Sequence, residues 1–329
     1  MKTLVIGGTL FIGRALVKAL RAAGHDVTVL HRKRSHRLGR GVGNLQADRN
    51  DPAAVRAAIG SRRFDAVFDN VYDWEHGTTA EQVAGTARAC GDSLTRYIFI
   101  SSVAAYGDGL DHSERDALAP ADHPDRYVRN KAESERALFR MHRRQGLPAV
   151  TLRPPYVYGP ENPFYREQFF WDRLRAGRPI IIPGDGRRLM QFVYVHDIVA
   201  ACMAALTTPG AAGQAFNIAE PAAITQLQAV RAFAAAADIE PRLVRVPRRI
   251  IAAAGGQVMQ PPLYFGFYYD MPPITMSTRK ARRVLGFQAT PFAEGLAETY
   301  RWRLRNHTLP PVEFHFEDSL LARGKDVKS

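Results

Sequence analysis

Short apolar runs alternate with amphipathic segments through the first half of the chain. The apolar runs predict buried strands at residues 4–6, 27–30, 66–68 and 97–100. Apolar residues recur at helical spacing in the segments between them, at residues 11–23, 52–59 and 79–90. Gly24 is the expected residue just past the end of the first helix. This alternation is typical of an α/β fold, a doubly wound parallel sheet with helices on both faces.

The pattern changes after a further predicted strand at residues 149–153. Residues 154–190 are rich in Pro, Gly and aromatic residues, and from Pro221 onward Ala-rich helical segments are joined by Pro-rich connections. We therefore expect a sheet domain and a smaller C-terminal substrate lobe. The expected sheet domain covers residues 1–155, with a return of the chain near 191–218, and the lobe is formed mainly by residues 156–329.

Composition narrows the class of protein. In 329 residues, 45 Lys and Arg against 32 Asp and Glu leave a net charge of +13, which favours anionic ligands such as phosphates or nucleic acid. Two cysteines, Cys90 and Cys202, are too few for a disulfide scaffold or a cysteine-based zinc site. We find neither a leader-like apolar segment after Met1 nor an apolar run of membrane-spanning length, so a membrane span is not expected. The small number of cysteines makes a reducing cytoplasm the expected location.

A glycine-rich turn joins the first predicted strand to the first helix. Such a turn can hold a dinucleotide pyrophosphate, because the N–H groups and the dipole of the helix N-terminus favour negative charge. Gly7 permits the tight turn, and Gly13 lets the helix approach the sheet. The expected contacts to the cofactor come from Gly7, Thr9, Leu10, Phe11, Ile12 and Gly13. Leu10 stands where a fully glycine-spaced turn has glycine, and a plain glycine-rich turn is the alternative interpretation.

The residues after the second strand indicate which dinucleotide is preferred. A carboxylate about 20 residues past the glycines would bind the adenosine 2′-hydroxyl of NAD. His31 stands there instead, followed by Arg32-Lys33-Arg34, and guanidinium groups suit a 2′-phosphate. The pattern favours NADP over NAD, while a solvated charge run or a nucleic-acid patch remains open. Asp48 is the expected partner of the adenine amino group.

Three residues form the candidate catalytic group. Tyr127 and Lys131 lie four positions apart and share one face of a predicted helix. Since an isolated tyrosine titrates near pH 10, a tyrosine base needs a neighbouring cation, and Lys131 can supply it and bind the nicotinamide ribose. Ser102 follows the strand at residues 97–100, where a hydroxyl faces the ligand crevice, although it can equally be an ordinary turn residue.

Five motifs in order resemble a known family. They are Gly7-Gly8-Thr9-Leu10-Phe11-Ile12-Gly13, Ser101-Ser102 with Tyr106-Gly107, Tyr127 with Lys131, the run from Arg153 to Pro160, and the run from Phe192 to Asp197. The chain resembles the extended short-chain dehydrogenase/reductase superfamily, in its NAD(P)-dependent epimerase/dehydratase family. This resemblance implies a Rossmann domain, a C-terminal substrate lobe and reversible hydride transfer at a sugar carbon. It also implies Ser102, Tyr127 and Lys131 as the catalytic trio, and Asn70 and Pro154 among the cofactor contacts.

Departures from the family pattern bear on the reaction and the substrate. Sugar 4,6-dehydratases of the family carry an acidic pair after the catalytic hydroxyl, where this chain has Val103 and Ala104, so dehydration is disfavoured and Val103 is a candidate substrate contact. Residues 184–192 resemble the loop that binds the substrate diphosphate. Met190 occupies the usual arginine position there, and Arg187 or Arg188 is the expected replacement.

Two functions therefore follow from the sequence. The first is an NAD(P)-dependent epimerase or reductase that acts on a sugar, especially a nucleotide sugar. The second is an RNA-associated or regulatory binding protein, because Asp69-Asn70 and the segments 169–174, 178–180 and 184–192 resemble the chloroplast stem-loop RNA-binding branch of the family. The intact Tyr-Lys pair favours the enzyme. By analogy with the family, a homodimer is expected.

Two further features have two interpretations each, and a third concerns the end of the chain. His196-Asp197 could be an acid–base or metal pair, but Asp197 is better interpreted as a helix N-cap, and no histidine spacing predicts a metal site. The aromatic run at residues 264–269 could stack on bases, but the core or pocket wall of the lobe is favoured. From about Asp318 the chain is expected to be a polar tail.

Overall fold

The computed structural model describes residues 1–91, 93–306 and 313–326, and the chain divides into two compact units. Unit 1 contains Met1–Val157, Val193–Pro221 and Ile274–Ala289. Unit 2 contains Tyr158–Phe192, Ala222–Pro273 and Thr290–Ser329. The chain thus enters unit 1 a third time at Ile274–Ala289, which no pattern in the sequence indicates.

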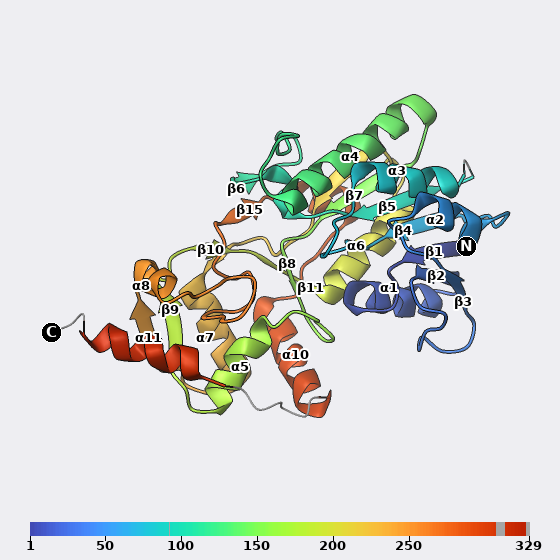
Figure 1. Cartoon of the computed structure of the whole chain (residues 1–329). Helices are drawn as coiled ribbons and strands as arrows, with labels where there is room; N and C mark the ends of the chain where they lie inside the picture. Colours follow the sequence, from blue (N-terminus) through green and yellow to red (C-terminus); the bar gives the residue numbers. More distant parts are fainter. Residues whose placement is uncertain (92, 307–312, 327–329) are drawn as a thin grey trace. The chain divides into compact units, whose positions relative to one another are not determined.

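Unit 1 is built on a seven-stranded sheet in which every pairing is parallel. In order across the sheet (Figure 1) the strands are β12 (Gln214–Asn217), β7 (Ala149–Arg153), β5 (Arg96–Ile100), β4 (Ala66–Asp69), β1 (Lys2–Ile6), β2 (Asp26–His31) and β3 (Val42–Gln46). Near-continuous apolar runs predicted β1, β2, β4, β5 and β7, because both faces of the sheet are covered. They did not predict the two edge strands, β3 and β12. The predicted α/β fold is confirmed.

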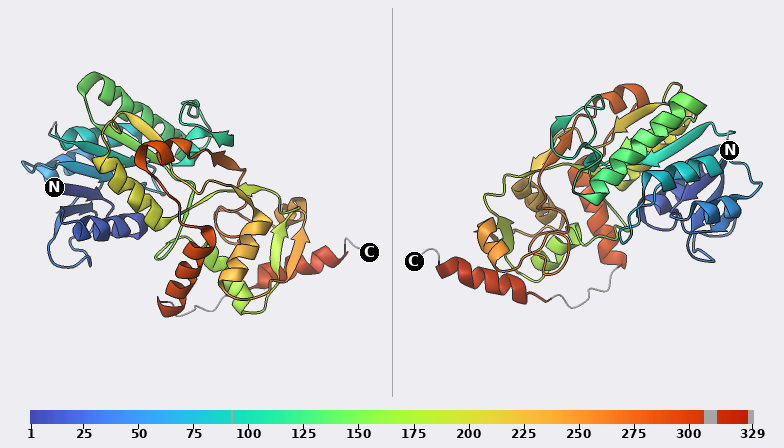
Figure 2. Two further views of the ribbon diagram at one scale, coloured as in Figure 1. Left: turned by 180° about the vertical axis from the view of Figure 1, so that it is seen from behind. Right: turned by 45° about the horizontal axis from the view of Figure 1, so that its top comes forward.

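Helices cover the two faces of this sheet. The helices α2 (Pro52–Ile59), α3 (Ala80–Ala89) and α4 (Arg126–Gln145) pack side by side on one face, and α1 (Phe11–Ala22) packs against α6 (Val195–Thr207) on the other, as Figures 1 and 2 show. The apolar stripe of α1 buries Phe11, Leu16, Val17 and Leu20. Gly24, with φ of +78°, follows α1 as predicted.

The strand order reverses at β1. From β1 the chain builds β2 and β3 on one side, and it then crosses over to build β4 and β5 on the other. Ligands of doubly wound sheets bind at such a switch point, beyond the carboxyl ends of the strands. The glycine-rich turn after β1 and the segments after β4 and β5 are therefore the places where the fold positions a site.

Other short elements complete the two units. In unit 1 they are η1 (Val103–Tyr106), β6 (Gly109–His112), β15 (Ile274–Met276) and α9 (Arg279–Leu285). In unit 2 they are α5 (Glu167–Arg175), β9 (Ile180–Pro183), β10 (Leu189–Met190), β13 (Ile224–Thr225), α7 (Gln226–Ala236), β14 (Leu243–Val246), α8 (Arg248–Ala253), α10 (Phe292–Asn306) and α11 (His315–Asp326). The remaining strands are β8 (Tyr156–Tyr158) and β11 (Phe192–Tyr194). Among the described residues, no helix is both long and apolar enough to cross a bilayer.

Unit 2 has an aromatic core. Phe170 stacks on Phe233 with ring centroids 4.9 Å apart, and Tyr269 and Phe265 close around them. The aromatic run at residues 264–269 therefore contributes to the core of this unit, as the favoured interpretation has it. The burial of apolar and aromatic area supplies the main stabilisation of such a core.

Two local predictions are wrong. The predicted polar tail from Asp318 lies within helix α11 as far as Asp326, which packs on unit 2 because Arg173 Nε donates to the buried Glu317 carboxylate at 2.7 Å. Asp197 is not an N-cap, because the strand β11 runs directly into α6 and places Tyr194 at the cap. Asp197 is instead buried in the first turn, where a carboxylate faces the positive end of the helix dipole.

Candidate active site

The glycine turn after β1 is shaped for a close backbone approach. Gly7 has φ of +83°, and a Cβ atom there would lie 2.2 Å from Cγ2 of Val71. A Cβ on Gly13 would lie 2.1 Å from the carbonyl oxygen of Gly7, so only glycine allows α1 to begin this close to the strand. The turn thus keeps the N-terminus of α1 open, and the residues present fit a dinucleotide pyrophosphate.

The residues between the two glycines differ in exposure. Leu10 occupies the N-cap position of α1 without a side-chain cap, and it is 67% exposed. Phe11 is buried and has φ of +39°, a sparsely populated conformation for a bulky residue and one that tends to be found at ligand clamps. Thr9 and Ile12 are half-buried on the same turn.

The expected adenosine end of the site lies at the end of β2. Nε2 of His31 lies 2.6 Å from Oδ1 of Asn44, which fixes the ring beside β3. The side chain of Arg32 is 72% exposed, and one of its guanidinium nitrogens lies 4.0 Å from the Asp73 carboxylate. No acidic residue stands at the end of β2, the place where a carboxylate would bind the hydroxyl groups of an NAD ribose.

The remaining predicted cofactor residues follow neighbouring strands. Asp48 comes two residues after β3, and its exposed carboxylate accepts from the backbone of Asn50 at 2.8 Å. Asn70 follows β4, and its N–H donates to the carbonyl of Ile6 at the end of β1. Pro154 follows β7 and accepts from the N–H of Val103 at 2.9 Å. All belong to the carboxyl edge of the sheet, as the parallel arrangement requires.

Helix α4 carries the predicted tyrosine and lysine. Its first turn is capped by Asp125, whose carboxylate accepts from the N–H groups of Tyr127 at 2.7 Å and Val128 at 3.2 Å. Gly146 ends the helix in the left-handed conformation. Between these caps the four-residue spacing places Tyr127 and Lys131 on one face, and Nζ of Lys131 lies 5.8 Å from the centroid of the Tyr127 ring.

Lys131 is buried inside unit 1. Its side chain is 5% exposed, Nζ donates to the carbonyl of Ile100 at 2.8 Å, and it lies 4.7 Å from the centroid of the Phe99 ring. Burial lowers the pKa of Lys131 to about 8, and the carboxylate of Asp69 acts in the opposite direction. The ammonium is therefore bound to the end of β5, directly before Ser101 and Ser102.

Ser102 lies where β5 passes into η1. Its buried hydroxyl accepts from the N–H of Ala104 at 3.1 Å, and α4 packs against η1. The fold thus brings Ser102, Tyr127 and Lys131 into one region of unit 1, where Lys131 contacts both the Tyr127 ring and the end of β5. The hydrogen bond to Ala104 agrees with the alternative interpretation of Ser102 as a turn residue.

A buried network that the sequence analysis missed fixes this region. The carboxylate of Glu135 accepts from Ser101 Oγ at 2.5 Å, from Thr151 Oγ1 at 2.9 Å and from the guanidinium of Arg153 at 2.7 Å. Although burial disfavours its charge, Glu135 and Tyr106 hold the pKa of Arg153 above its ordinary value. The only signal in the sequence is the helical spacing of Glu135, four residues after Lys131.

The predicted substrate arginines lie in unit 2. Arg187 is exposed, and its backbone N–H donates to Asp185. The guanidinium of Arg188 pairs with the buried Asp270 at 3.1 Å, and Arg248 shares the same carboxylate at 2.8 Å. Sequence reasoning missed this partner arginine, because Arg248 is 60 positions away. Within the described ranges, no group of three or more His, Cys, Asp and Glu residues is placed to hold a metal ion.

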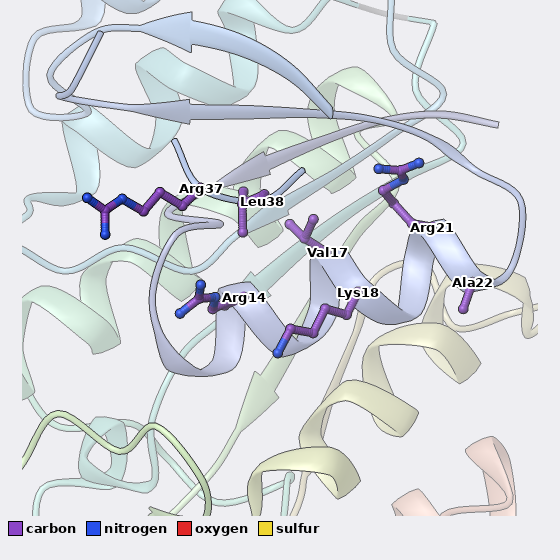
Figure 3. A pocket seen from close by; sticks show the side chains of 7 residues that line it. All are labelled: Arg14, Val17, Lys18, Arg21, Ala22, Arg37 and Leu38. Carbon is purple, nitrogen blue, oxygen red and sulfur yellow. The ribbon is translucent and has the colours of Figure 1, made fainter. Parts of the chain in front are cut away.

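A basic groove runs along the outer side of α1. Arg14, Lys18 and Arg21 line it from the helix, and Arg37 lines it from the segment between β2 and β3 (Figure 3). Its volume is about 400 Å³. Residues 11–41 contain eight basic residues and one acidic residue, so they hold +7 of the chain's net charge of +13. The groove is therefore a strong local anion attractor.

The switch-point site and its glycine turn define a dinucleotide-binding protein. The family model described as the NAD dependent epimerase/dehydratase family matches residues 3–219, and the chain belongs to that family. It is thus an NAD-dependent oxidoreductase or isomerase, as predicted. The Rossmann arrangement that the resemblance implied is confirmed as well.

The relatives of this chain are named for different functions, some for binding and some for catalysis. The chain is 29% identical to a chloroplast stem-loop binding protein of 41 kDa from Arabidopsis thaliana, over 98% of this chain and 84% of the relative. It is 30% identical to a 2-alkyl-3-oxoalkanoate reductase of Stenotrophomonas maltophilia, over 69% of this chain and 73% of the relative. The structure of MoeE5 with UDP-glucuronic acid and NAD aligns with a TM-score of 0.72 at 25% identity, over 93% of this chain and 100% of that chain.

The buried ammonium of Lys131 predicts a pH-dependent stability. A lysine in the unfolded chain titrates near pH 10.4, above the folded value of about 8, so the folded state loses this proton first as the pH rises. Below pH 8 both states carry the charge, and its burial costs on the order of 3 kcal/mol, a cost that disappears between pH 8 and about 10.4. Relative to a Lys131→Met variant, the wild type should therefore gain stability over this interval.

Urea unfolding of both proteins at pH 7 and pH 10 measures this difference. The matched control is Lys33→Met, at an exposed lysine whose removal should leave the pH dependence unchanged. Equal pH dependence in the wild type and Lys131→Met would contradict the prediction.

Proposed function

We propose that the chain is an NADP-preferring epimerase or reductase that acts on a hydroxyl or keto group of a sugar, with nucleotide sugars as the leading substrate class. The observation that carries the proposal is the placement of Tyr127 and Lys131 on one face of α4, with the lysine held at the end of β5. The NAD-dependent family and the UDP-sugar in the MoeE5 structure support it.

The proposed roles follow from chemistry and position. Tyr127 removes the proton of a substrate hydroxyl, or returns it to a carbonyl oxygen, and Ser102 orients that oxygen. Lys131 favours the charged form of Tyr127 through its ammonium, and it is placed to bind the ribose of the cofactor. When bound, the nicotinamide accepts or supplies the hydride that leaves or joins the same carbon. Release of an oxidised product, or return of the hydride to the other face, distinguishes dehydrogenation from epimerisation.

Contacts in the glycine turn are proposed to hold the pyrophosphate. Thr9, Leu10, Phe11 and Ile12 present the N-terminus of α1, and Gly7 and Gly13 allow the approach. Asp48, Asn70 and Pro154 follow strands that end at the same edge. On the substrate side, Val103 begins η1, and Arg187 and Arg188 of unit 2 are the proposed anion contacts.

Removal of the tyrosine hydroxyl tests the mechanism. Tyr127→Phe should lower turnover by about 100-fold or more, because a positioned acid–base group contributes that much, while its affinity for NADP stays within about twofold. The assay is product analysis and absorbance of the reduced cofactor with a panel of nucleotide sugars and their keto forms. Tyr300→Phe, which removes a hydroxyl in unit 2, is the matched control. Unchanged turnover in Tyr127→Phe would sink the proposed mechanism.

The exposed arginine after β2 tests the cofactor preference. His31 and Arg32 offer a 2′-phosphate a cation and offer an NAD ribose no carboxylate. We expect NADP to bind about tenfold more tightly than NAD, and Arg32→Asp to remove or invert that ratio. Calorimetric titration with both cofactors measures it, with Arg63→Asp as a control of equal charge change. Equal affinities of the wild type for both cofactors would contradict the preference.

A second candidate function has its own observation. The basic groove along α1, the charge of +7 in residues 11–41 and the stem-loop binding relative support binding of an RNA backbone. Lys18→Glu with Arg21→Glu should weaken binding of a labelled stem-loop RNA at least tenfold and reduce its salt dependence. Arg245→Glu with Arg249→Glu, an equal change on unit 2, should alter it little. Equal effects of the two double variants, or no binding at low salt, would exclude the groove.

A further inference from the structure

The ring of Tyr127 is enclosed by two aromatic residues from the segment that follows β4. Trp74 stacks on it with ring centroids 4.9 Å apart and planes 22° from parallel. Tyr72 meets it edge-on, with centroids 4.8 Å apart and planes at 90°. Tyr72 and Trp74 also touch each other at 5.2 Å. We define these two residues as the aromatic wall.

Hydrogen bonds hold the segment that carries the aromatic wall. Oδ1 of Asp73 accepts from the N–H groups of Glu75 at 2.9 Å and His76 at 3.0 Å, which forms a local turn. The N–H of Asp73 donates to Thr78 Oγ1 at 3.0 Å. A second set of hydrogen bonds joins residues 72–75 to helix α4.

Helix α4 supplies the donors of this second set. The guanidinium of Arg126, the residue before Tyr127, donates to the carbonyl oxygens of Glu75 at 2.9 Å and Trp74 at 3.3 Å. Asn130 donates to the hydroxyl of Tyr72 at 3.2 Å. The aromatic wall is therefore fixed to the helix that carries Tyr127 and Lys131, so its position relative to Tyr127 is preorganised.

Trp74 is nevertheless 48% exposed. An indole kept half in water contributes much less to stability than a buried one, and Trp171 in unit 2 is fully buried. A rigid aromatic side chain that is anchored at its backbone and exposed beside a reactive phenol is the arrangement expected for a ligand contact.

We propose that Trp74, supported by Tyr72, is a substrate-binding wall that stacks on the apolar face of a ring at or next to the reacting carbinol carbon. This inference rests on the proposed function, because it takes the Tyr127 hydroxyl as the group that the substrate oxygen reaches. The shared chemistry is a ring with an exposed C–H or π face. Either a pyranose or an aromatic ring supplies it, and open-chain alcohols lack it.

Intrinsic fluorescence of the full-length chain saturated with reduced NADP tests the proposal without turnover, because the alcohol probes then have no hydride acceptor. The chain has three tryptophans, so Trp74→Phe removes the exposed reporter, and Trp302→Phe is the matched control. The sugar arm compares UDP-glucose with UDP, and the aromatic arm compares 1-phenylethanol with 2-butanol. We expect a ring-dependent change in one arm that disappears in Trp74→Phe and persists in Trp302→Phe. The responding arm identifies the ring chemistry.

Kinetics separate a substrate wall from mere support of Tyr127. Trp74→Ala should raise KM for the responding ring substrate about 3- to 10-fold, the range of aromatic contacts, and leave kcat within about twofold. Trp74→Phe, which keeps a ring against Tyr127, should raise KM less. A lower kcat at unchanged KM would assign Trp74 to positioning alone and overturn the proposal.

Binding and turnover distinguish this proposal from the proposed function. Ring-dependent fluorescence changes with full turnover in Tyr127→Phe would overturn the mechanism and leave the aromatic wall standing. Wild-type ring affinity in Trp74→Ala, or no ring-dependent change in either arm, would overturn the wall even if Tyr127 proved catalytic. The melting temperature and NADP affinity of each variant show that it folds.

Discussion

The carboxylate of Glu135 is the interaction on which the site of unit 1 depends. It lies on α4 and binds Ser101 at the end of β5 together with Thr151 and Arg153 of β7. A buried ion pair of this kind adds little net stability, because desolvation of both charges offsets their attraction. Its effect here is geometric. It sets the position of α4 along the two strands, and with it the positions of Tyr127 and Lys131.

The same helix places an ammonium where the fold gives it few polar neighbours. Lys131 is buried between Phe99 and Tyr72, and the carbonyl of Ile100 is its hydrogen-bond acceptor. Burial disfavours this charge, and the nearby Asp69 partly restores it. Asp69 is in turn held by Arg49 and by Tyr97 at 2.7 Å. A chain of buried polar groups thus connects the sheet interior to the proposed catalytic face.

Much of this arrangement follows from local sequence. The strands β1, β2, β4, β5 and β7, the helices α1, α2 and α3 and the glycine turn were predictable, because apolar periodicity and glycine conformation are properties of neighbouring residues. The spacing of Tyr127 and Lys131 predicted their shared face for the same reason. The aromatic wall and the Glu135 network were not predictable, because their partners lie tens of residues apart. The helix at Asp318 was missed because the burial of Glu317 depends on Arg173, 144 positions away.

The sequence by itself determined the fold class, the glycine-rich turn and the candidate residues Ser102, Tyr127 and Lys131, since each depends on backbone preference or on spacing within one element. Only the tertiary structure decided what surrounds them. Stacking of Trp74 on Tyr127, burial of Lys131 and sharing of Asp270 by Arg188 and Arg248 all join separate segments. Such contacts arise only when strand order and helix packing bring those segments together, and no local pattern encodes that distance.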